Sequence, residues 1–398
     1  MDLNTGIHFD HIYLFAPPWG PIKHRPHHLI RALASGFGAK VLYVEDTGNR
    51  AAFAWLPPWR LLRKLEPGLW AMKRFKLIPF ESKKKWMQSV NRRAVALAVK
   101  LFARILGMKN IVAWYWSPLF HEYVGMFNED VAICDNACET SLYTWASAKV
   151  REDERALLRK TDLAFAATEP LMQRAAADNT HAYVLAQAVD LETFQRAARR
   201  GDDKPAEFKL LNGPILGFTG NIHEWIDGAL LREVAVQRPS WQLALIGPVR
   251  DVGDTLKEVA KFRDLPNVHM LGPRDYETLP SYVSWFDVCL IPYRLDEITK
   301  VSETVKFYEY LATGKPIVST DLPPLRKWGD AVYLAGNPAE FIECVEKALR
   351  EPPSSQERRR GLARINTWSS RAELATELIR EAWIRKHGTS GAEKPRPA

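Results

Sequence analysis

Short apolar runs alternate with longer amphipathic segments along almost the whole chain. In the first half, strands are predicted at residues 11–16, 41–44, 111–115, 131–134, 163–166 and 183–185. In the second half, they are predicted at residues 215–219, 242–246, 268–271, 288–291, 317–319 and 332–334. Strands that are apolar throughout are typical of parallel sheets that helices cover on both faces. The pattern therefore predicts an α/β fold with two sheets.

A polar, charged stretch separates the two sets of strands. It reads RAARRGDDKPAEFK and has the composition of an interdomain linker. The predicted organisation is a first domain (1–195), a linker (196–209), a second domain (210–369), a C-terminal helix (370–386) and a disordered tail (387–398).

The composition indicates a folded protein without a membrane-spanning segment. The chain has 398 residues, of which 46% are hydrophobic, and a net charge of +8 that favours anionic partners such as nucleotides and phospholipids. Its four cysteines lack the spacing of a metal site and are typical of reduced thiols in the cytosol. The first residues are too polar for a signal peptide, and no apolar run reaches about 18 residues. We therefore expect a cytoplasmic protein.

Residues 59–104 carry most of the positive charge. They contain thirteen Lys and Arg residues against two acids, Glu66 and Glu81, which gives a local charge of +11. Trp, Leu, Phe and Met side chains lie between the basic residues, as in interfacial membrane segments. A solvated helix face that covers the first domain is the alternative. Nucleic acid is not expected, because no nucleic-acid-binding motif accompanies the basic residues.

Two residues that follow predicted strands of the first domain are candidates for chemistry. Gly20 follows the first strand and would let the backbone approach a ligand. Asp135 comes directly after the strand at 131–134, where parallel sheets bind ligands, and could act as a general base. A helix cap or a loop hydrogen bond is the alternative for Asp135.

The stretch SETVKFYEYLATGKPIVST, residues 302–320, predicts a helix start, a short helix, a glycine stop at Gly314 and a buried strand. Ser302 could cap the helix. Lys306 and Glu309 lie one turn apart, off the apolar face. A helix start beside a lysine is an anion site, and the carboxylate could bind sugar hydroxyls. An ordinary surface helix with a Lys–Glu pair is the alternative.

Five segments carry a resemblance to a known family: VKFYEYLATGKPIVSTDLPPL, RPHHLIRALA, FTGNIHEWID, WQLALIGPV and LGPRDYETLPSYVSWFDVCLIPY. In order and spacing they resemble the GT-B glycosyltransferases, in particular family 4 and its group 1 relatives in bacterial surface-polysaccharide synthesis. The resemblance implies two Rossmann-like, doubly wound parallel-sheet domains that face a central cleft. The second domain would bind a nucleotide-sugar, and the first would bind a glycan or lipid-linked acceptor. The C-terminal helix (370–386) would pack back on the first domain.

The resemblance also implies roles for residues that match the family's motifs. Glu309 would hold the donor ribose, and Ser302, Glu303, Thr304 and Lys306 would meet the diphosphate. Gly220 and Asn221 would pass close to the phosphates or the sugar, and Arg274 and Tyr276 would frame the base. Gly20, Arg25 and His121 would lie on the acceptor side. For His121, a packed or solvent-facing histidine without a role in binding is the alternative.

The sequence departs from the family's pattern after the first strand of the second domain. Many members carry an Arg and a Lys there, where this chain reads NIHEWIDGALLREV. The diphosphate charge would then fall to Lys306, Arg250, Arg294 or Lys300, together with the helix dipole. The Glu303-Thr304 pair replaces small residues, so Glu303 would touch the donor sugar or cap the helix.

These features predict a glycosyltransferase without a metal or other cofactor, since no Asp-x-Asp motif is present. Asp135 is the candidate base of an inverting enzyme, whereas in a retaining enzyme the donor phosphate would take the acceptor's proton. The sequence leaves both mechanisms open. The alternatives are a sugar-nucleotide epimerase and a catalytically inactive GT-B module that binds a membrane or partner proteins. We expect residues 59–104 to meet an anionic membrane surface, peripherally on the inner face of the plasma membrane.

Overall fold

The chain forms two compact units. The computed structural model describes residues 7–20, 22–46, 52–53, 61–78, 84–136, 140, 146–198 and 204–388. Unit 1 comprises Met1–Ala186 and Ser369–Ala398, and unit 2 comprises Gln187–Trp368. Residues 187–195, which we expected in the first domain, thus belong to unit 2. Parts of the predicted linker (199–203), tail (389–398) and basic segment (59–60 and 79–83) lie outside the described residues.

Unit 1 is built on an eight-stranded sheet with the order β10-β9-β8-β7-β1-β2-β5-β4. The strands are β1 (Asp10–Ala16), β2 (Val41–Glu45), β4 (Leu62–Glu66), β5 (Leu69–Lys73), β7 (Ile111–Tyr115), β8 (Val131–Asn136), β9 (Leu163–Ala166) and β10 (Ala182–Val184). All neighbours pair in parallel except β4, which is antiparallel to β5. A separate two-stranded sheet joins β3 (Ala52–Phe53) to β6 (Phe75–Lys76). The six predicted strands are confirmed, whereas β4 and β5, which lie in the basic segment, were not predicted.

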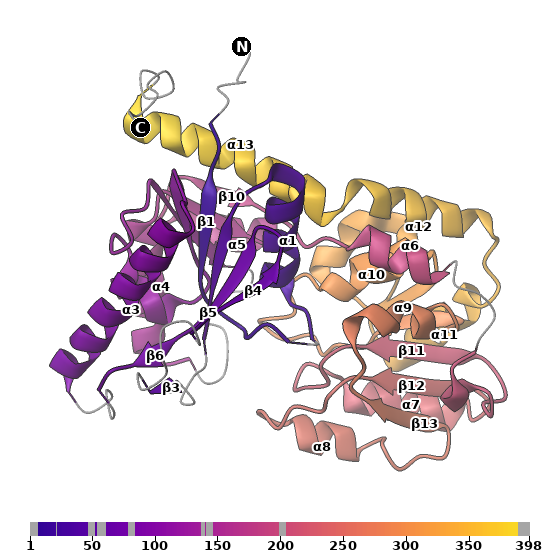
Figure 1. The fold of residues 1–398 in the computed structure, drawn as a ribbon. Helices are drawn as coiled ribbons and strands as arrows, with labels where there is room; N and C mark the ends of the chain where they lie inside the picture. Colours follow the sequence, from indigo (N-terminus) through magenta and orange to yellow (C-terminus); the bar gives the residue numbers. More distant parts are fainter. Residues whose placement is uncertain are drawn as a thin grey trace. The chain divides into compact units, whose positions relative to one another are not determined.

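Helices cover both faces of this sheet (Figure 1). They are α1 (Arg25–Phe37), α3 (Lys85–Ile105), the 3-10 helix η3 (Pro118–Tyr123), α4 (Ala148–Lys160), α5 (Glu169–Ala176) and α13 (Trp368–His387). Ile12 and Leu14 of β1 share a buried cluster with Val95 of α3 and Leu157 of α4. Because side chains alternate along a strand, Tyr13 faces the other side, where its ring stacks on those of Tyr43 and Trp114.

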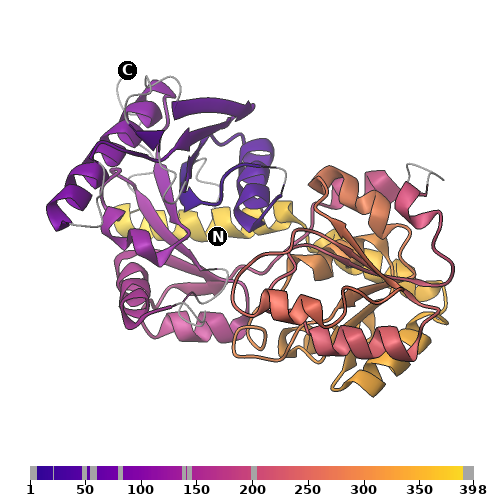
Figure 2. The ribbon, with the colours of Figure 1, turned by 90° about the horizontal axis from the view of Figure 1, so that it is seen from below.

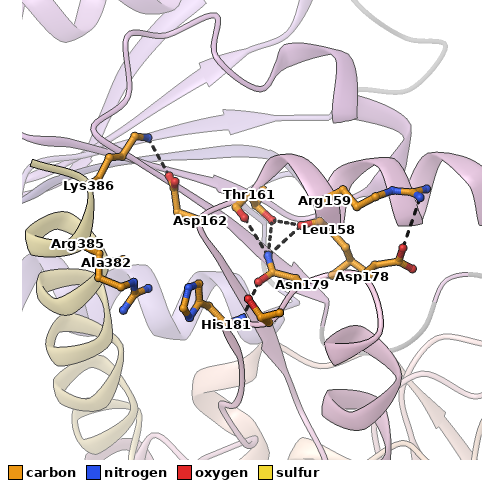
Figure 3. Close-up of a pocket in the computed structure, with 11 residues that line it drawn as sticks. Leu158, Arg159, Thr161, Asp162, Asp178, Asn179, His181, Ala382, Arg385 and Lys386 are labelled. Atoms are coloured by element: carbon orange, nitrogen blue, oxygen red, sulfur yellow. Dashed lines mark hydrogen bonds and ion pairs between the residues drawn. The ribbon is translucent and has the colours of Figure 1, made fainter.

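The apolar stripe of α13 packs on unit 1, and it includes Ala372, Ala375 and Ile379, all of which are fully buried. Near its end, α13 lines a pocket of about 470 Å³ together with the end of α4 and the turns before β9 and β10 (Figure 3). The pocket therefore lies at the edge of the sheet where these strands begin.

The charges around this pocket are largely paired with one another (Figure 3). Lys386 of α13 lies 3.0 Å from Asp162, and Arg159 lies 3.6 Å from Asp178. The Asn179 amide donates to the carbonyl oxygens of Leu158 and Thr161 at 2.9 and 2.8 Å. These pairs hold α13 and the strand beginnings in place.

Unit 2 has a six-stranded, wholly parallel sheet with the order β13-β12-β11-β14-β15-β16. The strands are β11 (Ile215–Thr219), β12 (Gln242–Ile246), β13 (Val268–Gly272), β14 (Val288–Ile291), β15 (Ile317–Thr320) and β16 (Tyr333–Ala335). All six were predicted. The chain winds outward from β11 to β13 and then returns to β14, so the strand order reverses between β11 and β14. In open parallel sheets, ligands bind at the carboxyl ends of the strands beside such a reversal.

Helices cover both faces of the unit 2 sheet (Figure 2). They are α6 (Leu191–Ala198), α7 (Gly228–Gln237), α8 (Thr255–Ala260), α9 (Leu279–Val283), α10 (Val305–Thr313), α11 (Pro338–Ala348) and α12 (Ser354–Ile365). Helices α6, α9, α10 and α12 pack together on one side, and α7, α8 and α11 on the other. One large apolar cluster joins both layers to the sheet.

The chain enters and leaves unit 2 through paired segments. The Val189 N–H donates to the Asn366 carbonyl at 3.1 Å, and the Trp368 N–H donates to the Val189 carbonyl at 3.3 Å. Val189 and Thr367 thereby form a parallel bridge. In the described part of the chain, no helix has both the length and the apolar character needed to cross a membrane.

Candidate functional site

Glycines end the strands beside the reversal in unit 2. Gly220 follows β11 with φ 120°, and Gly247 follows β12 with φ 150°. A Cβ atom on Gly220 would lie 2.3 Å from Cε of Lys306, and one on Gly247 would lie 1.9 Å from the Gly220 carbonyl oxygen. A side chain at Gly247 would collide with the backbone, and one at Gly220 would displace the end of the Lys306 side chain and adopt a φ that L-residues avoid. The backbone itself therefore forms this edge of the site.

Helix α10 begins at this edge. Its N-cap is Thr304, whose side chain makes no capping hydrogen bond, and its first turn contains no acidic residue. The expectation that Ser302 caps the helix is therefore wrong, because the helix begins at Val305. The Ser302 hydroxyl oxygen is buried and has no hydrogen-bond partner among the described residues. The helix start thus offers backbone N–H groups and a spare hydroxyl to an anion.

Lys306 supplies a cation beside these groups. Its ammonium nitrogen lies 5.2 Å from the ring centre of Phe218 and 5.9 Å from that of Tyr293. Among the described residues, no carboxylate lies within ion-pair distance of it. Its charge is therefore held by aromatic faces and stays available to a ligand.

The other predicted cations differ in how far their charges are neutralised. Arg294 lies 3.6 Å from Glu258, and Lys300 lies 2.9 Å from Glu297. Arg250 instead donates from Nε to the Asn221 side-chain oxygen at 3.3 Å, which joins two predicted donor-binding residues. Of these four candidates, Lys306 and Arg250 keep the most available charge.

His223 lies close enough to Lys306 and Arg250 for both charges to affect its pKa. Burial lowers the pKa of His223 to about 4, with further lowering by Lys306 and Arg250. The imidazole is therefore neutral at pH 7, so one ring nitrogen can donate a hydrogen bond and the other can accept one. His223 lies within the segment FTGNIHEWID, but the sequence analysis gave this residue no role.

Glu309 lies one turn beyond Lys306 on α10 and is buried. Burial raises its pKa to about 7, while Lys306 and the Tyr276 hydroxyl oppose the rise and Asp190 adds to it. The expectation that Glu309 lies off the apolar face is wrong, because all residues from Phe307 to Thr313 are buried. The surface-helix alternative is thereby excluded.

Two further predicted donor residues have partners within unit 2. The Glu303 carboxylate accepts from the Tyr308 hydroxyl at 2.7 Å and lies 3.0 Å from the Lys327 ammonium. It therefore links α10 to the 3-10 helix η7 (Pro323–Ala331), and it does not cap α10. Arg274 donates to Glu207 at 2.6 Å and to the Tyr282 hydroxyl at 3.0 Å, whereas Tyr276 lies beside Glu309.

In unit 1, Asp135 and Arg25 bind each other. Asp135 lies inside β8 and not after it, and its side chain is 0% exposed. The Arg25 guanidinium donates to it at 3.1 and 3.2 Å, and the Tyr13 hydroxyl donates at 2.5 Å. Burial and the Asp135 charge raise the pKa of Tyr13 well above its usual range. Tyr13 was not predicted, because its pattern is that of an ordinary strand residue.

Gly20 and His121, the other predicted acceptor-side residues, have ordinary surroundings. The Gly20 carbonyl accepts from the Lys23 ammonium at 2.9 Å, and a Cβ atom on Gly20 would meet nothing closer than 3.8 Å. His121 lies on η3, with Nδ1 3.2 Å from the Pro118 carbonyl and 3.7 Å from Asp153. Among the residues that the structure describes, no group of three or more His, Cys, Asp or Glu side chains could hold a metal ion.

Known proteins resemble this chain in sequence and in fold. Residues 213–351 match the family described as Glycosyl transferases group 1. The chain is also 32% identical over 182 residues to TuaH of Bacillus subtilis (strain 168), a protein assigned to teichuronic acid biosynthesis as a glycosyltransferase. That match spans 44% of this chain and 44% of the relative, less than half of either.

Solved structures match the fold over nearly the whole chain. Sucrose-phosphate synthase from Thermosynechococcus elongatus has a TM-score of 0.68 at 17% identity and covers 94% of this chain and 100% of its own. A UDP-forming trehalose-phosphate synthase from Burkholderia xenovorans has a TM-score of 0.65 at 12% identity, covering 94% and 99%. A trehalose-6-phosphate structure from E. coli bound with UDP-2-fluoro glucose gives 0.68 at 12%, covering 94% and 99%. The chain therefore has the expected GT-B fold, and residues 213–351 of unit 2 are similar to the group 1 glycosyl transferases.

Proposed function

We propose that the protein transfers a sugar from a nucleotide-sugar donor to a glycan or lipid-linked acceptor in bacterial surface-polysaccharide synthesis. The family that residues 213–351 match and the name of the Bacillus subtilis relative both concern glycosyl transfer. They favour transfer over an epimerase or an inactive module.

The observation that carries the proposal is the anion site at the start of α10. There the glycine edge at Gly220, the helix start without a side-chain cap and the ammonium of Lys306 converge. Within the described part of the chain, that ammonium has no ion-pair partner. Glu309 lies one turn further along the same helix, at a spacing that lets a ligand meet a cation with its phosphates and a carboxylate with its ribose. A nucleoside diphosphate has this arrangement of charge and hydroxyl groups.

In the proposed reaction, the acceptor oxygen forms a bond to the anomeric carbon of the sugar. The bond from that carbon to the diphosphate oxygen breaks, and the diphosphate leaves with the electron pair. Lys306, Arg250 and the α10 N–H groups would stabilise the charge that develops on the diphosphate. This assignment uses the chain's own cations, with no metal and no further cofactor.

The acceptor's proton has two destinations. An inverting enzyme needs a carboxylate base, and a retaining enzyme passes the proton to the leaving phosphate. Both oxygens of Asp135 receive hydrogen bonds from Arg25 or Tyr13. These hydrogen bonds engage both carboxylate oxygens in a buried ion pair, which would have to break before Asp135 could take a proton from the acceptor. This environment favours the retaining route.

We also propose that the reaction takes place at the cytoplasmic face of the plasma membrane. The charge of +11 over residues 59–104 supports attraction to an anionic leaflet, where lipid-linked glycans are found.

Calorimetry with UDP, GDP, ADP, CDP and dTDP tests the donor site. We expect at least one of these to bind the native protein and to bind Lys306→Gln about tenfold or more weakly, since a hydrogen-bonded charge contributes roughly 1.5–3 kcal/mol. Lys300→Gln is the matched control, because Lys300 is paired with Glu297 and should leave affinity unchanged. The proposal fails if no nucleoside diphosphate or nucleotide-sugar binds, or if Lys306→Gln binds like the native protein.

A further inference from the structure

Helix α3 carries two apolar faces. Val95, Val99 and Phe102 form the inner face and belong to the core of unit 1. On the opposite side, the exposed fractions are 55% for Trp86, 38% for Val90, 67% for Leu97 and 51% for Leu101. With 3.6 residues per turn, these four side chains share one stripe that points away from the core. We call them the α3 outer stripe.

Such a stripe is unusual on a helix that already buries its other face. Single exposed apolar residues are common on protein surfaces, but four at helical spacing form a continuous strip that marks an interaction site. Ile105, which is 66% exposed, extends the apolar surface at the end of the helix. Trp70, which also lies in the basic segment, is instead partly buried and packed against the core of unit 1.

The charge beside the stripe has one sign. Helix α3 contains the basic residues Lys85, Arg92, Arg93, Lys100 and Arg104 and no acidic residue. Arg92 is paired with Glu122 of η3. The helical phase places Arg93, Lys100 and Arg104 along one edge of the outer stripe. Among the described residues, no ion pair neutralises these three.

We infer that the α3 outer stripe is a docking surface for an anionic lipid bilayer, with the apolar side chains in the interface and the three bases against lipid phosphates. An apolar strip flanked by cations alone complements such a surface on both counts. A protein partner or a second copy of this chain would need acidic groups opposite the bases. Binding to lipid does not depend on the transferase activity. That the lipid carries the acceptor rests on the proposed function.

Co-sedimentation with vesicles tests this surface. The vesicles are phosphatidylcholine alone, or phosphatidylcholine mixed with phosphatidylglycerol, at low and high salt. We expect the native protein to bind only the anionic vesicles. Neutralising Arg93, Lys100 and Arg104 together with Gln should weaken partitioning about a hundredfold at low salt, at about fivefold per base. Leu97→Gln with Leu101→Gln should weaken it about tenfold or more at either salt concentration.

Matched controls change equally exposed residues of unit 2. Ile365→Gln replaces an apolar side chain that is 68% exposed, and glutamines at Arg232, Lys347 and Arg350 remove three exposed charges. Neither control should alter vesicle binding. Circular dichroism checks folding, and calorimetry with nucleoside diphosphates reports separately on unit 2.

Three outcomes would overturn the inference. The native protein could ignore anionic vesicles at low salt, or both α3 variants could bind like the native protein. Alternatively, size-exclusion chromatography could show that the Leu97/Leu101 variant dissociates a native dimer while no form binds vesicles, which would make the stripe an interface between copies. Loss of nucleotide binding with intact vesicle binding would count against the proposed function alone.

Discussion

The buried carboxylate of Glu309 gives the site a dependence on pH. Its pKa is about 7, so it is partly protonated at neutral pH, whereas ribose hydroxyls donate best to the ionised form. Donor affinity should therefore rise as the pH passes upward through about 7, and binding should release a proton. Calorimetry in two buffers of different ionisation enthalpy measures that release.

The variant Glu309→Gln keeps the side chain's shape and removes its charge. We expect about tenfold weaker donor binding that no longer varies between pH 6 and 8, since a hydrogen bond to a charged group is worth roughly 1.5–3 kcal/mol. The folded pKa lies above the unfolded value, so native stability should fall as the pH rises from about 4.5 to 7, by up to about 3 kcal/mol. Urea unfolding of the variant should lack this fall. Equal pH dependence of both proteins would contradict the assignment.

Asp135 and Arg25 form a buried ion pair that should contribute to stability. Removing one partner of a buried ion pair leaves the other charge unpaired, which typically costs 3–5 kcal/mol. We expect Asp135→Asn and Arg25→Gln each to destabilise the protein by about 3 kcal/mol, and the double variant by less than their sum. Denaturant unfolding of all four proteins closes the cycle. A stable Asp135→Asn protein that binds donor normally but has lost turnover by orders of magnitude would instead identify Asp135 as a base.

At the scale of elements, the close approach of β11 and α10 depends on one glycine. Alanine at Gly220 would meet the Lys306 side chain and would adopt φ 120°, which L-residues avoid. We expect Gly220→Ala to weaken nucleoside diphosphate binding at least tenfold by displacing Lys306. In Gly361→Ala, an added Cβ atom meets nothing within 4 Å, so this variant is the control and should bind normally. Calorimetry compares the nucleoside diphosphate affinities of the two variants. Equal affinities would show that binding does not depend on the observed position of the Lys306 side chain.

The buried strands could be predicted closely from sequence, since the boundaries of β7, β9, β11, β12 and β14 coincide with the apolar runs. Strand β4 could not, because charged residues interrupt the apolar residues of LRKLE. Strand β5 has an apolar run in LWAMK, but it lies in the basic segment that we interpreted as an interfacial segment or a helix face. The helical pattern placed Lys306 and Glu309 correctly on one helix. It did not predict that Glu309 is buried, because a periodic pattern does not show that other elements pack on both sides of a helix. The contact between Arg25 and Asp135 joins residues 110 positions apart, which no local pattern encodes.

At the scale of the whole molecule, unit 2 is inserted into unit 1. Unit 1 consists of two separate stretches of sequence, and the chain enters and leaves unit 2 through the bridged residues Val189 and Thr367. The candidate donor-site residues, from Gly220 to Glu309, all lie in unit 2. The α3 outer stripe lies in unit 1. Substitutions in the stripe should therefore leave donor affinity unchanged, and substitutions in the donor site should leave vesicle binding unchanged.

The return of α13 to unit 1 also sets the order in which the protein can be completed on the ribosome. All of unit 2 is synthesised before Ala372, Ala375 and Ile379, whose side chains complete the packing of unit 1. While unit 2 is being translated, unit 1 of the nascent chain is therefore incomplete. The apolar surface that α13 later covers is exposed during this time. A chain that stops after Trp368 would contain all the candidate donor-site residues, but the apolar surface of unit 1 that α13 covers would stay exposed.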